Sequence, residues 1–284
     1  MKVFACLVLF AAVACATPSI GDLGKRLHDR LTGPAVGVNP FIIDGENAVE
    51  KSAPYVVSLS ASNLVAAHSC AGTIIGKEWI LTAAHCVDEL NKLTGNVLGL
   101  TVYAGLTNRT NDEDAQVRSI DFAFNHKQYT GVEGSDDIAL LHVTPAFKFG
   151  ANVKAAALPY RKEQFDGETS ANYGWGLEDA ESSMYVKDLK VAKSDVLTAE
   201  ECKEALPTDA PVSSKQICVK VAACYGDGGS PLVVEREGDV AELIGITSWG
   251  YMPCGYNNRP TVYTAVSQYV DWINEVQWAY YILY

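Results

Sequence analysis

The chain has 284 residues, of which 48% are hydrophobic and 20% charged, which is enough to bury one large core or two smaller ones. Its formal net charge of −12 argues against nucleic acid as a partner, because phosphate binding needs concentrated Lys and Arg. Beyond the N-terminus no apolar run is long enough to span a membrane, so we expect a globular protein without a membrane span.

Residues 1–16 have the pattern of a secretory signal peptide. Lys2 precedes an apolar run over 3–13, and the segment ends in the small residues Ala14-Cys15-Ala16. A short membrane anchor is the alternative, but the run is too short to span a bilayer comfortably. We therefore expect a secreted, extracellular protein that begins at Thr17 after cleavage. Residues 17–41, rich in Gly, Pro and small polar residues, predict a pro-segment or N-terminal extension.

From Tyr55 onward the sequence has an all-β rhythm. Short apolar runs at 55–59, 72–75, 102–104, 137–143, 232–234 and 243–249 alternate with turn-rich spacers, as in barrels or sandwiches. The small, Pro-containing stretch 153–161 is a plausible boundary between two β units. Apolar residues recur at helical spacing over 266–276, which predicts a C-terminal helix. We expect the aromatic tail 278–284 to pack against the body, with a docking patch as the alternative.

Six cysteines remain once Cys6 and Cys15 are assigned to the signal peptide. In an oxidising compartment they predict three disulfides, although counting alone leaves the pairing open. Their spacing lacks the CxxC pairs of zinc sites, so we expect no metal and no cofactor. The triplet Asn108-Arg109-Thr110 is a glycosylation sequon, which indicates an exposed, glycosylated loop or an unused sequon.

Several motifs follow one another along the chain. They are Ile42-Ile43-Asp44-Gly45, Pro54-Tyr55, Leu81-Thr82-Ala83-Ala84-His85-Cys86, Asp137-Ile138-Ala139-Leu140, Gly226-Asp227-Gly228-Gly229-Ser230-Pro231-Leu232 and Ser248-Trp249-Gly250. In identity and order they resemble the trypsin/chymotrypsin family of serine proteases, and with their spacing they cover nearly all of residues 42–276. The resemblance implies an all-β fold of two antiparallel six-stranded β-barrels with a C-terminal α-helix over residues 42–284. It also implies disulfides joining Cys70 to Cys86, Cys202 to Cys218 and Cys224 to Cys254.

By the same resemblance His85 is the general base and Asp137 orients it, and the N–H groups of Gly226 and Gly228 form the oxyanion hole. Gly228, however, occupies the place of the nucleophilic serine. Losing the nucleophile from such a unit costs on the order of 10⁶ in turnover. Ser230 is a displaced candidate, but its Cα lies roughly 6 to 7 Å further along an extended backbone. The pair Gly228-Gly229 provides the flexibility that a rescue would need.

The resemblance places a specificity pocket at six residues: Ala222, Ala223, Ser248, Trp249, Gly250 and Thr261. No carboxylate stands at its base to pair with Arg or Lys, so we expect a short, apolar pocket, or one that no ligand uses.

Activation also departs from the tryptic pattern, because Phe41 precedes Ile42 where tryptic relatives have a basic residue. The resemblance implies that Asp227 receives the ammonium group of Ile42 after cleavage and that His68 partners Asp227 before it, unless His68 makes a plain structural hydrogen bond. The run 112–114 resembles a calcium loop, but its ligand pattern is incomplete and a solvated turn is favoured.

Three functions remain open from the sequence. The first is a catalytically silent protease homologue that binds an extracellular protein or peptide. The second is an active secreted endopeptidase that uses Ser230, with chymotrypsin-like or elastase-like specificity. The third is an inert secreted protein that retains only the fold.

Overall fold

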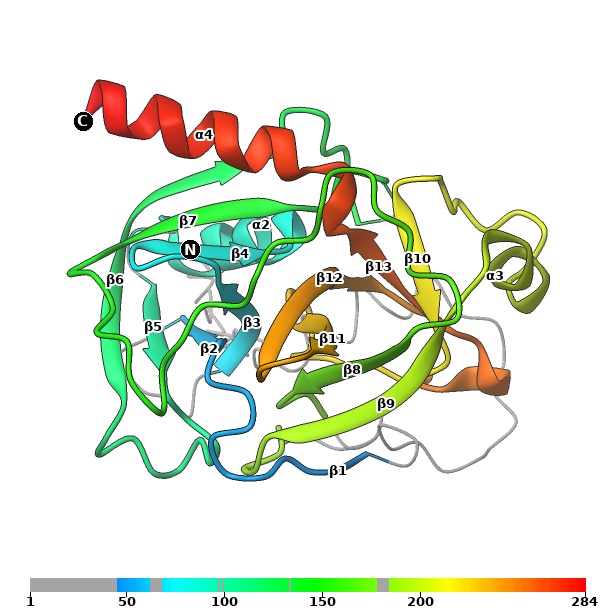
Figure 1. Cartoon of the computed structure of the whole chain (residues 1–284), viewed down its shortest axis with the longest axis horizontal. Coiled ribbons are helices and arrows are strands. Elements are labelled where there is room, and N and C mark those ends of the chain that lie inside the picture. Colours follow the sequence, from blue (N-terminus) through cyan, green and yellow to red (C-terminus); the bar gives the residue numbers. More distant parts are fainter. Residues whose placement is uncertain (1–44, 62–67, 97, 99, 133, 178–183) are drawn as a thin grey trace, which may run out of the picture. The chain divides into compact units, whose positions relative to one another are not determined.

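The computed structural model describes residues 45–284 except 62–67, 97, 99, 133 and 178–183. Within these residues the first half forms a closed antiparallel barrel with strand order β2-β3-β4-β7-β6-β5, and β5 closes it by pairing with β2 (Figure 1). Its strands are β2 (Val56–Ser60), β3 (His68–Ile74), β4 (Trp79–Thr82), β5 (Thr101–Ala104), β6 (Gln116–Asn125) and β7 (Ala139–Thr144).

The second half forms a second antiparallel barrel. Its strands follow the order β9-β10-β13-β12-β11-β8, and β8 closes the ring by also pairing with β9, while β1 (Glu46–Asn47) adds to the outside of β9. Its strands are β8 (Thr169–Gly174), β9 (Lys190–Leu197), β10 (Gln216–Val219), β11 (Pro231–Arg236), β12 (Val240–Trp249) and β13 (Thr261–Ala265). The all-β class and the two six-stranded barrels are therefore confirmed. Residues 145–168 connect the two barrels.

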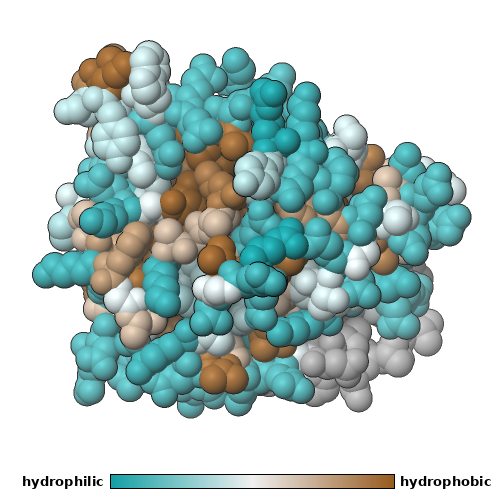
Figure 2. Space-filling view, viewed as in Figure 1, coloured by the Kyte–Doolittle hydropathy of each residue, from teal (hydrophilic) through white to brown (hydrophobic). Residues whose placement is uncertain are grey.

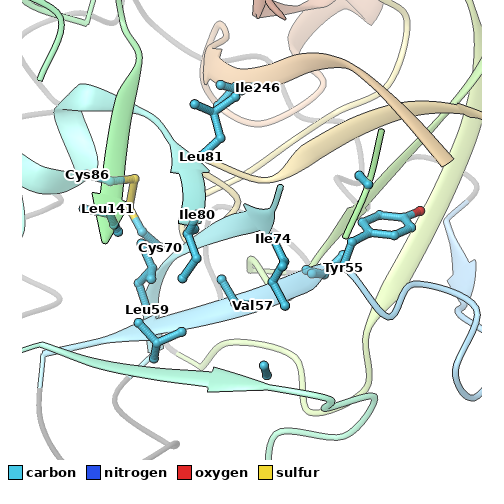
Figure 3. Close-up of a cluster of buried hydrophobic side chains, with 14 of the residues drawn as sticks. Tyr55, Val57, Leu59, Cys70, Ile74, Ile80, Leu81, Cys86, Leu141 and Ile246 are labelled. Atoms are coloured by element: carbon cyan, nitrogen blue, oxygen red, sulfur yellow. A yellow bond between two sulfur atoms is a disulfide. The ribbon is translucent and has the colours of Figure 1, made fainter. Parts of the chain in front are cut away.

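One apolar cluster joins the two barrels. Inward-facing side chains of β2, β3 and β4 meet in Figure 3, where Ile246 of β12 points into the same cluster. Leu59, Ile74 and Leu81 are completely buried, and each such side chain contributes about 1.5–3 kcal/mol through burial. Packing is tight enough that a Cβ at Gly72 would lie 2.7 Å from the Ile80 side chain, so this position requires glycine. The cluster fixes the line along which the barrels meet.

Three disulfides hold the loops of the fold. They join Cys70 to Cys86, Cys202 to Cys218 and Cys224 to Cys254. The first, visible in Figure 3, ties β3 to helix α2 (Ala84–Thr94). The second ties helix α3 (Ala199–Ala205) to β10, and α3 starts at a capping box in which Thr198 and Glu201 satisfy each other's backbone N–H groups.

The C-terminal helix α4 spans Val270–Leu283, and residues Val266–Gln268 form a separate 3₁₀ turn, η4. The helix therefore begins later than the periodicity predicted, because residues 266–268 form this tighter turn instead of a first turn of α-helix. Another 3₁₀ turn, η3 (Tyr256–Asn258), precedes β13. Among the helices in the described ranges, none has the length and apolarity that a membrane crossing needs.

The aromatic tail packs against the first barrel with one face. The ring of Tyr280 lies 4.2 Å from that of His142, and Trp79 donates its indole N–H to the Tyr281 hydroxyl at 3.1 Å. The opposite face is exposed at Trp278 and Ile282, and Figure 2 shows hydrophobic surface at the free end of α4. The structure therefore has the packing that we expected of the tail, with apolar groups left over on the outer face.

Candidate active site

His85 and Asp137 meet because two strands pair in register. Strand β4 ends at Thr82 opposite Ala139, where the antiparallel strand β7 begins, so the residues just beyond one strand and just before the other share an edge. His85 follows in the first turn of α2. Its backbone N–H donates to Asp137 Oδ1 at 2.9 Å, and its ring Nδ1 donates to Oδ2 at 2.7 Å. These two bonds fix both the position of the ring and the nitrogen that carries the first proton.

The second barrel holds the Asp137 carboxylate from the other side. Ser248 of β12 donates its hydroxyl to Oδ2 at 2.6 Å, and Thr264 of β13 donates to the backbone carbonyl of Asp137 at 2.8 Å. The carboxylate is fully buried. We expected Ser248 to line the pocket, but its hydroxyl is turned to the carboxylate, which sequence reasoning missed. The pair of His85 and Asp137 is therefore positioned jointly by both barrels.

The charge of His85 follows from these neighbours. Burial lowers the pKa of its imidazole, but the charge and hydrogen bond of Asp137 outweigh burial, and with Glu89 and Asp88 they raise the pKa to about 9. At neutral pH the ring is therefore an imidazolium, with both nitrogens protonated. A general base must be unprotonated to accept a proton, so this ring is poorly poised for that role at pH 7.

Gly228 brings no side-chain oxygen to this ring. The residue is held in place because its carbonyl accepts from Ala71 N–H at 2.8 Å, and the next N–H, of Gly229, donates to Thr247 at 3.0 Å. A Cβ added at Gly228 would lie 2.5 Å from Nε2 of His85. The imidazole therefore lies in the space that a serine side chain would need. Its Nε2 is 3.5 Å from the disulfide sulfur of Cys86.

Ser230 is buried next to Gly174, away from His85. Its N–H donates to the Asp227 carbonyl at 2.9 Å, and its own carbonyl accepts from the N–H of Thr247 at 2.9 Å. The residue is fully buried, and its hydroxyl lies 3.3 Å from where a Cβ on Gly174 would stand. Among the described residues this hydroxyl has no hydrogen-bond partner, His85 included.

Asp227 is buried against two glycines. Its carboxylate accepts from the N–H of Gly176 at 2.8 Å and from the N–H of Cys224 at 2.9 Å. Burial raises its pKa to about 6, although these two bonds oppose the shift. A Cβ at Gly174 or Gly176 would overlap the carboxylate, so both glycines make room for it.

His68 makes the structural hydrogen bonds that were the alternative to a pairing with Asp227. Its ring bonds to the Ser58 hydroxyl at 2.7 Å and, through Nε2, to the carbonyl of Gly226 at 2.9 Å. Burial and the charge of Arg109 lower its pKa to about 3, so the ring is neutral and donates to that carbonyl. Phe41 and Ile42 lie outside the described residues, as do the segments 1–16 and 17–41.

Two backbone N–H groups flank Asp227, those of Gly226 and Gly228. Gly226 has a φ of 91°, which favours glycine, and a Cβ there would lie 2.7 Å from the ring of Tyr185. In the part of the chain that the structure describes, neither N–H donates to another group. The N–H of Asp227, which stands between them, donates to the carbonyl of Cys224 at 3.0 Å.

At the predicted pocket, Thr261 of β13 is hydrogen-bonded to the segment 221–223. Its hydroxyl donates to the carbonyl of Val221 at 2.7 Å and accepts from the N–H of Ala223 at 3.1 Å. A Cβ on Gly250, in the facing wall, would lie 3.7 Å from that hydroxyl. Ala222 is buried and Trp249 half-buried beside them.

The sequence also pointed to a glycosylation site and an acidic run, and it argued against a metal site. The amide nitrogen of Asn108 donates to the Asp188 carboxylate at 2.6 Å. Residues 112–114 are exposed. Cys70, Cys86 and His85 are metal-ligating types within 4.8 Å of one another, but both sulfurs belong to a disulfide and offer no thiolate.

Comparisons with known proteins agree with this geometry. A family model described as Trypsin matches residues 42–273. Lectizyme from Glossina austeni is 36% identical over 82% of this chain and 85% of that protein, and trypsin II-P29 from Gallus gallus is 33% identical over 96% of this chain and 99% of that protein. Coagulation factor XI from Bos taurus is 34% identical over 91% of this chain, which spans 41% of that longer protein. These matches run through both barrels, and the chain therefore belongs to the trypsin family of serine proteases.

Proposed function

We propose that this chain is a secreted, catalytically silent protease homologue that acts by binding an extracellular protein or peptide. The observation that carries the proposal is the space beside Nε2 of His85. A glycine stands at the nucleophile position, and the imidazole itself fills the volume that a serine would occupy. Without a hydroxyl there, no acyl-enzyme is formed by the family mechanism.

Binding remains possible because the parts that hold a peptide backbone need no serine. Among the described residues the N–H groups of Gly226 and Gly228 donate to no other group, and neither they nor the residues predicted to line the specificity pocket depend on the nucleophile. Secretion is supported by the signal pattern of residues 1–16 and by three disulfides, which form and persist in oxidising compartments.

An active endopeptidase that uses Ser230 is the alternative. It would require the hydroxyl to leave its place beside Gly174 and Asp227, and both backbone bonds of Ser230 hold it there. A displacement of about 1 Å in an active site already costs about a hundredfold, so a remodelled loop would have to be well ordered. An inert secreted protein is the third possibility, and binding experiments distinguish it from the first.

The test is covalent labelling with a peptidyl organophosphonate that carries Ala next to the phosphorus, followed by peptide mapping. We expect no labelling of the mature protein and no hydrolysis of a matching peptide ester beyond that of a His85→Ala variant. The proposal is wrong if the label is attached to Ser230 and a Ser230→Ala variant loses both labelling and turnover.

The binding half of the proposal needs its own experiment. We expect pull-down from the extracellular fluid of the source to recover a saturable partner, and a substitution at Trp249 beside the cleft to weaken it. An inert protein would recover no saturable partner with either variant.

A further inference from the structure

The last two turns of α4 carry no charge on any side. Residues 276–284 contain no charged side chain, and Gln277 is their one amide. One side of these turns packs against the first barrel through Tyr280, whose ring lies 4.2 Å from that of His142. The exposed residues form what we call the outer patch: Trp278, Tyr281, Ile282, Leu283 and Tyr284. A helix that is hydrophobic on all sides is normally buried on all sides, so this sequence is typical of a helix end that is covered on both faces.

The outer patch is held in place by the body of the protein. The Tyr281 hydroxyl accepts from the indole N–H of Trp79 at 3.1 Å and donates to the Glu78 carboxylate at 3.2 Å. The ring of Tyr284 lies 4.5 Å from that of Phe122 on β6. Side chains that are already ordered lose less conformational freedom on association, so the patch is preorganised for a partner.

The outer patch is large for an apolar surface of a monomer. Its five residues are between 59% and 76% exposed. With about 150–250 Å² for each aromatic side chain, and less for Ile282 and Leu283, the patch offers on the order of 600 Å². The largest apolar patch on a typical monomer is about 300–600 Å² and is often functional, whereas a standard interface buries about 800 Å² on each partner. The outer patch therefore supplies about three quarters of the area that one side of a stable interface needs.

The chemistry of the outer patch favours a second copy of this chain as the partner. Anionic lipid attracts Lys and Arg, and α4 contains neither. Interfaces between identical chains are the more apolar class, and their centres are depleted of charge and enriched in Trp and Tyr. In a twofold-symmetric dimer the same surface meets itself, so an uncharged aromatic patch is complementary to its own copy. The two acidic residues of the helix, Asp271 and Glu275, precede the patch.

We propose that the chain forms a symmetric dimer in which the outer patches of two copies pack against each other. Trp278 and Ile282 lie one turn apart on the face of α4 opposite the first barrel, and they form the centre of this interface. The dimer goes beyond the proposed function and does not depend on it, because no residue of the outer patch belongs to the candidate active site.

The net charge of the chain gives the dimer a recognisable dependence on salt. Each copy has a formal net charge of −12, so two copies repel each other, and dissolved salt screens that repulsion. The apolar contact itself is not weakened by screening. Dimerisation should therefore become tighter as salt is added, whereas an interface that depends on ion pairs would become weaker.

The test is sedimentation velocity of the secreted chain over about 0.5–200 µM protein, at about 0.05 M and about 0.5 M sodium chloride. We expect one equilibrium between monomer and dimer, with tighter association at the higher salt concentration. Its dissociation constant should be micromolar, because about 1,200 Å² buried in total is at the low end of specific interfaces.

Matched variants locate the interface. Trp278→Ala and Ile282→Ala shorten exposed side chains, so both should fold as the natural chain does, and each should weaken dimerisation at least about tenfold. Tyr160→Ala removes an aromatic side chain that is even more exposed but lies in the connection between the barrels, and it should leave dimerisation unchanged. Circular dichroism checks the folding of all three variants.

Four results would overturn the dimer. They are a chain that stays monomeric up to about 200 µM at both salt concentrations, a dimer that Trp278→Ala leaves unchanged, assemblies that grow beyond the dimer, and association that weakens with salt. Cosedimentation with phosphatidylcholine vesicles is measured in parallel. Binding of a monomeric chain to these vesicles, lost in Trp278→Ala, would assign the outer patch to a lipid surface instead. None of these results bears on whether the protein is catalytically silent.

Discussion

Restoring the missing oxygen with Gly228→Ser is the sharpest perturbation of this site. The added Cβ would lie 2.5 Å from Nε2, whereas ordinary contacts begin at 3.4 Å, so the ring must withdraw by about 1 Å. Asp137 holds Nδ1 during that movement. A nucleophile is worth on the order of 10⁶ in turnover, and a residual misplacement of about 1 Å costs about a hundredfold. The expected gain over the natural chain is therefore about 10⁴-fold when the ring is neutral.

The pH dependence of the gain follows from the same ring. Because the pKa of His85 is about 9, only about one ring in a hundred is neutral at pH 7. Hydrolysis by the variant should therefore be about a hundredfold weaker at pH 7 than its plateau above pH 9, with activity rising about tenfold per pH unit between them. The assay is release of alcohol from an acetyl-tripeptide ester ending in Ala.

A matched control distinguishes the effect of the hydroxyl oxygen from the effect of the added Cβ. Gly228→Ala introduces the same Cβ without a hydroxyl, and we expect no gain from it at any pH. N-terminal sequencing of each preparation records whether it begins at Thr17 or at Ile42. The reasoning is refuted if Gly228→Ser, folded and cut before Ile42, hydrolyses no faster at pH 9 than Gly228→Ala does.

Three further outcomes are expected. The ring of His85 should titrate near pH 9 by NMR, above the ordinary 6.5, and a midpoint near 6.5 would contradict this. Its contribution to the free energy of unfolding is therefore complete below pH 6.5 and is lost as pH rises through 9. Ser230→Ala removes a buried hydroxyl without a partner and should raise the stability in urea unfolding by up to about 1 kcal/mol, whereas a loss above about 1 kcal/mol would show a missed bond. Thr261→Gly removes two hydrogen bonds and should cost about 1–3 kcal/mol in urea unfolding, whereas a stability equal to that of the natural chain would show that these bonds contribute nothing.

Much of the fold could be predicted from patterns within short stretches of the sequence. The runs that became β5, β11 and β12 were identified because closed barrels bury short apolar strands between turns, and this texture is local. The C-terminal helix was identified as well, but its start was placed too early. The periodicity of residues 266–268 is shared by a 3₁₀ turn, which period alone does not distinguish from the helix.

The arrangement of the site depended on contacts between distant segments. Nothing near Ser248 in the sequence indicates that its hydroxyl bonds to Asp137, 111 residues away, or that Tyr185 covers Gly226. The sequence left two roles open for His68, a pairing with Asp227 and a plain structural hydrogen bond. The structure shows the second: Asp227 takes two backbone N–H groups, and the His68 ring bonds to Ser58 and to the carbonyl of Gly226.

The sequence by itself determined that the chain has a two-barrel protease scaffold and that a glycine stands where a hydroxyl is required. Those facts reside in residue identities and in their order. Only the tertiary structure shows which group occupies the space that the serine side chain would need. The imidazole lies in the space left by the missing side chain, and three carboxylates around it hold its proton. Electrostatic energy and packing depend on distances across the fold, and such distances are set only when both barrels close around the site.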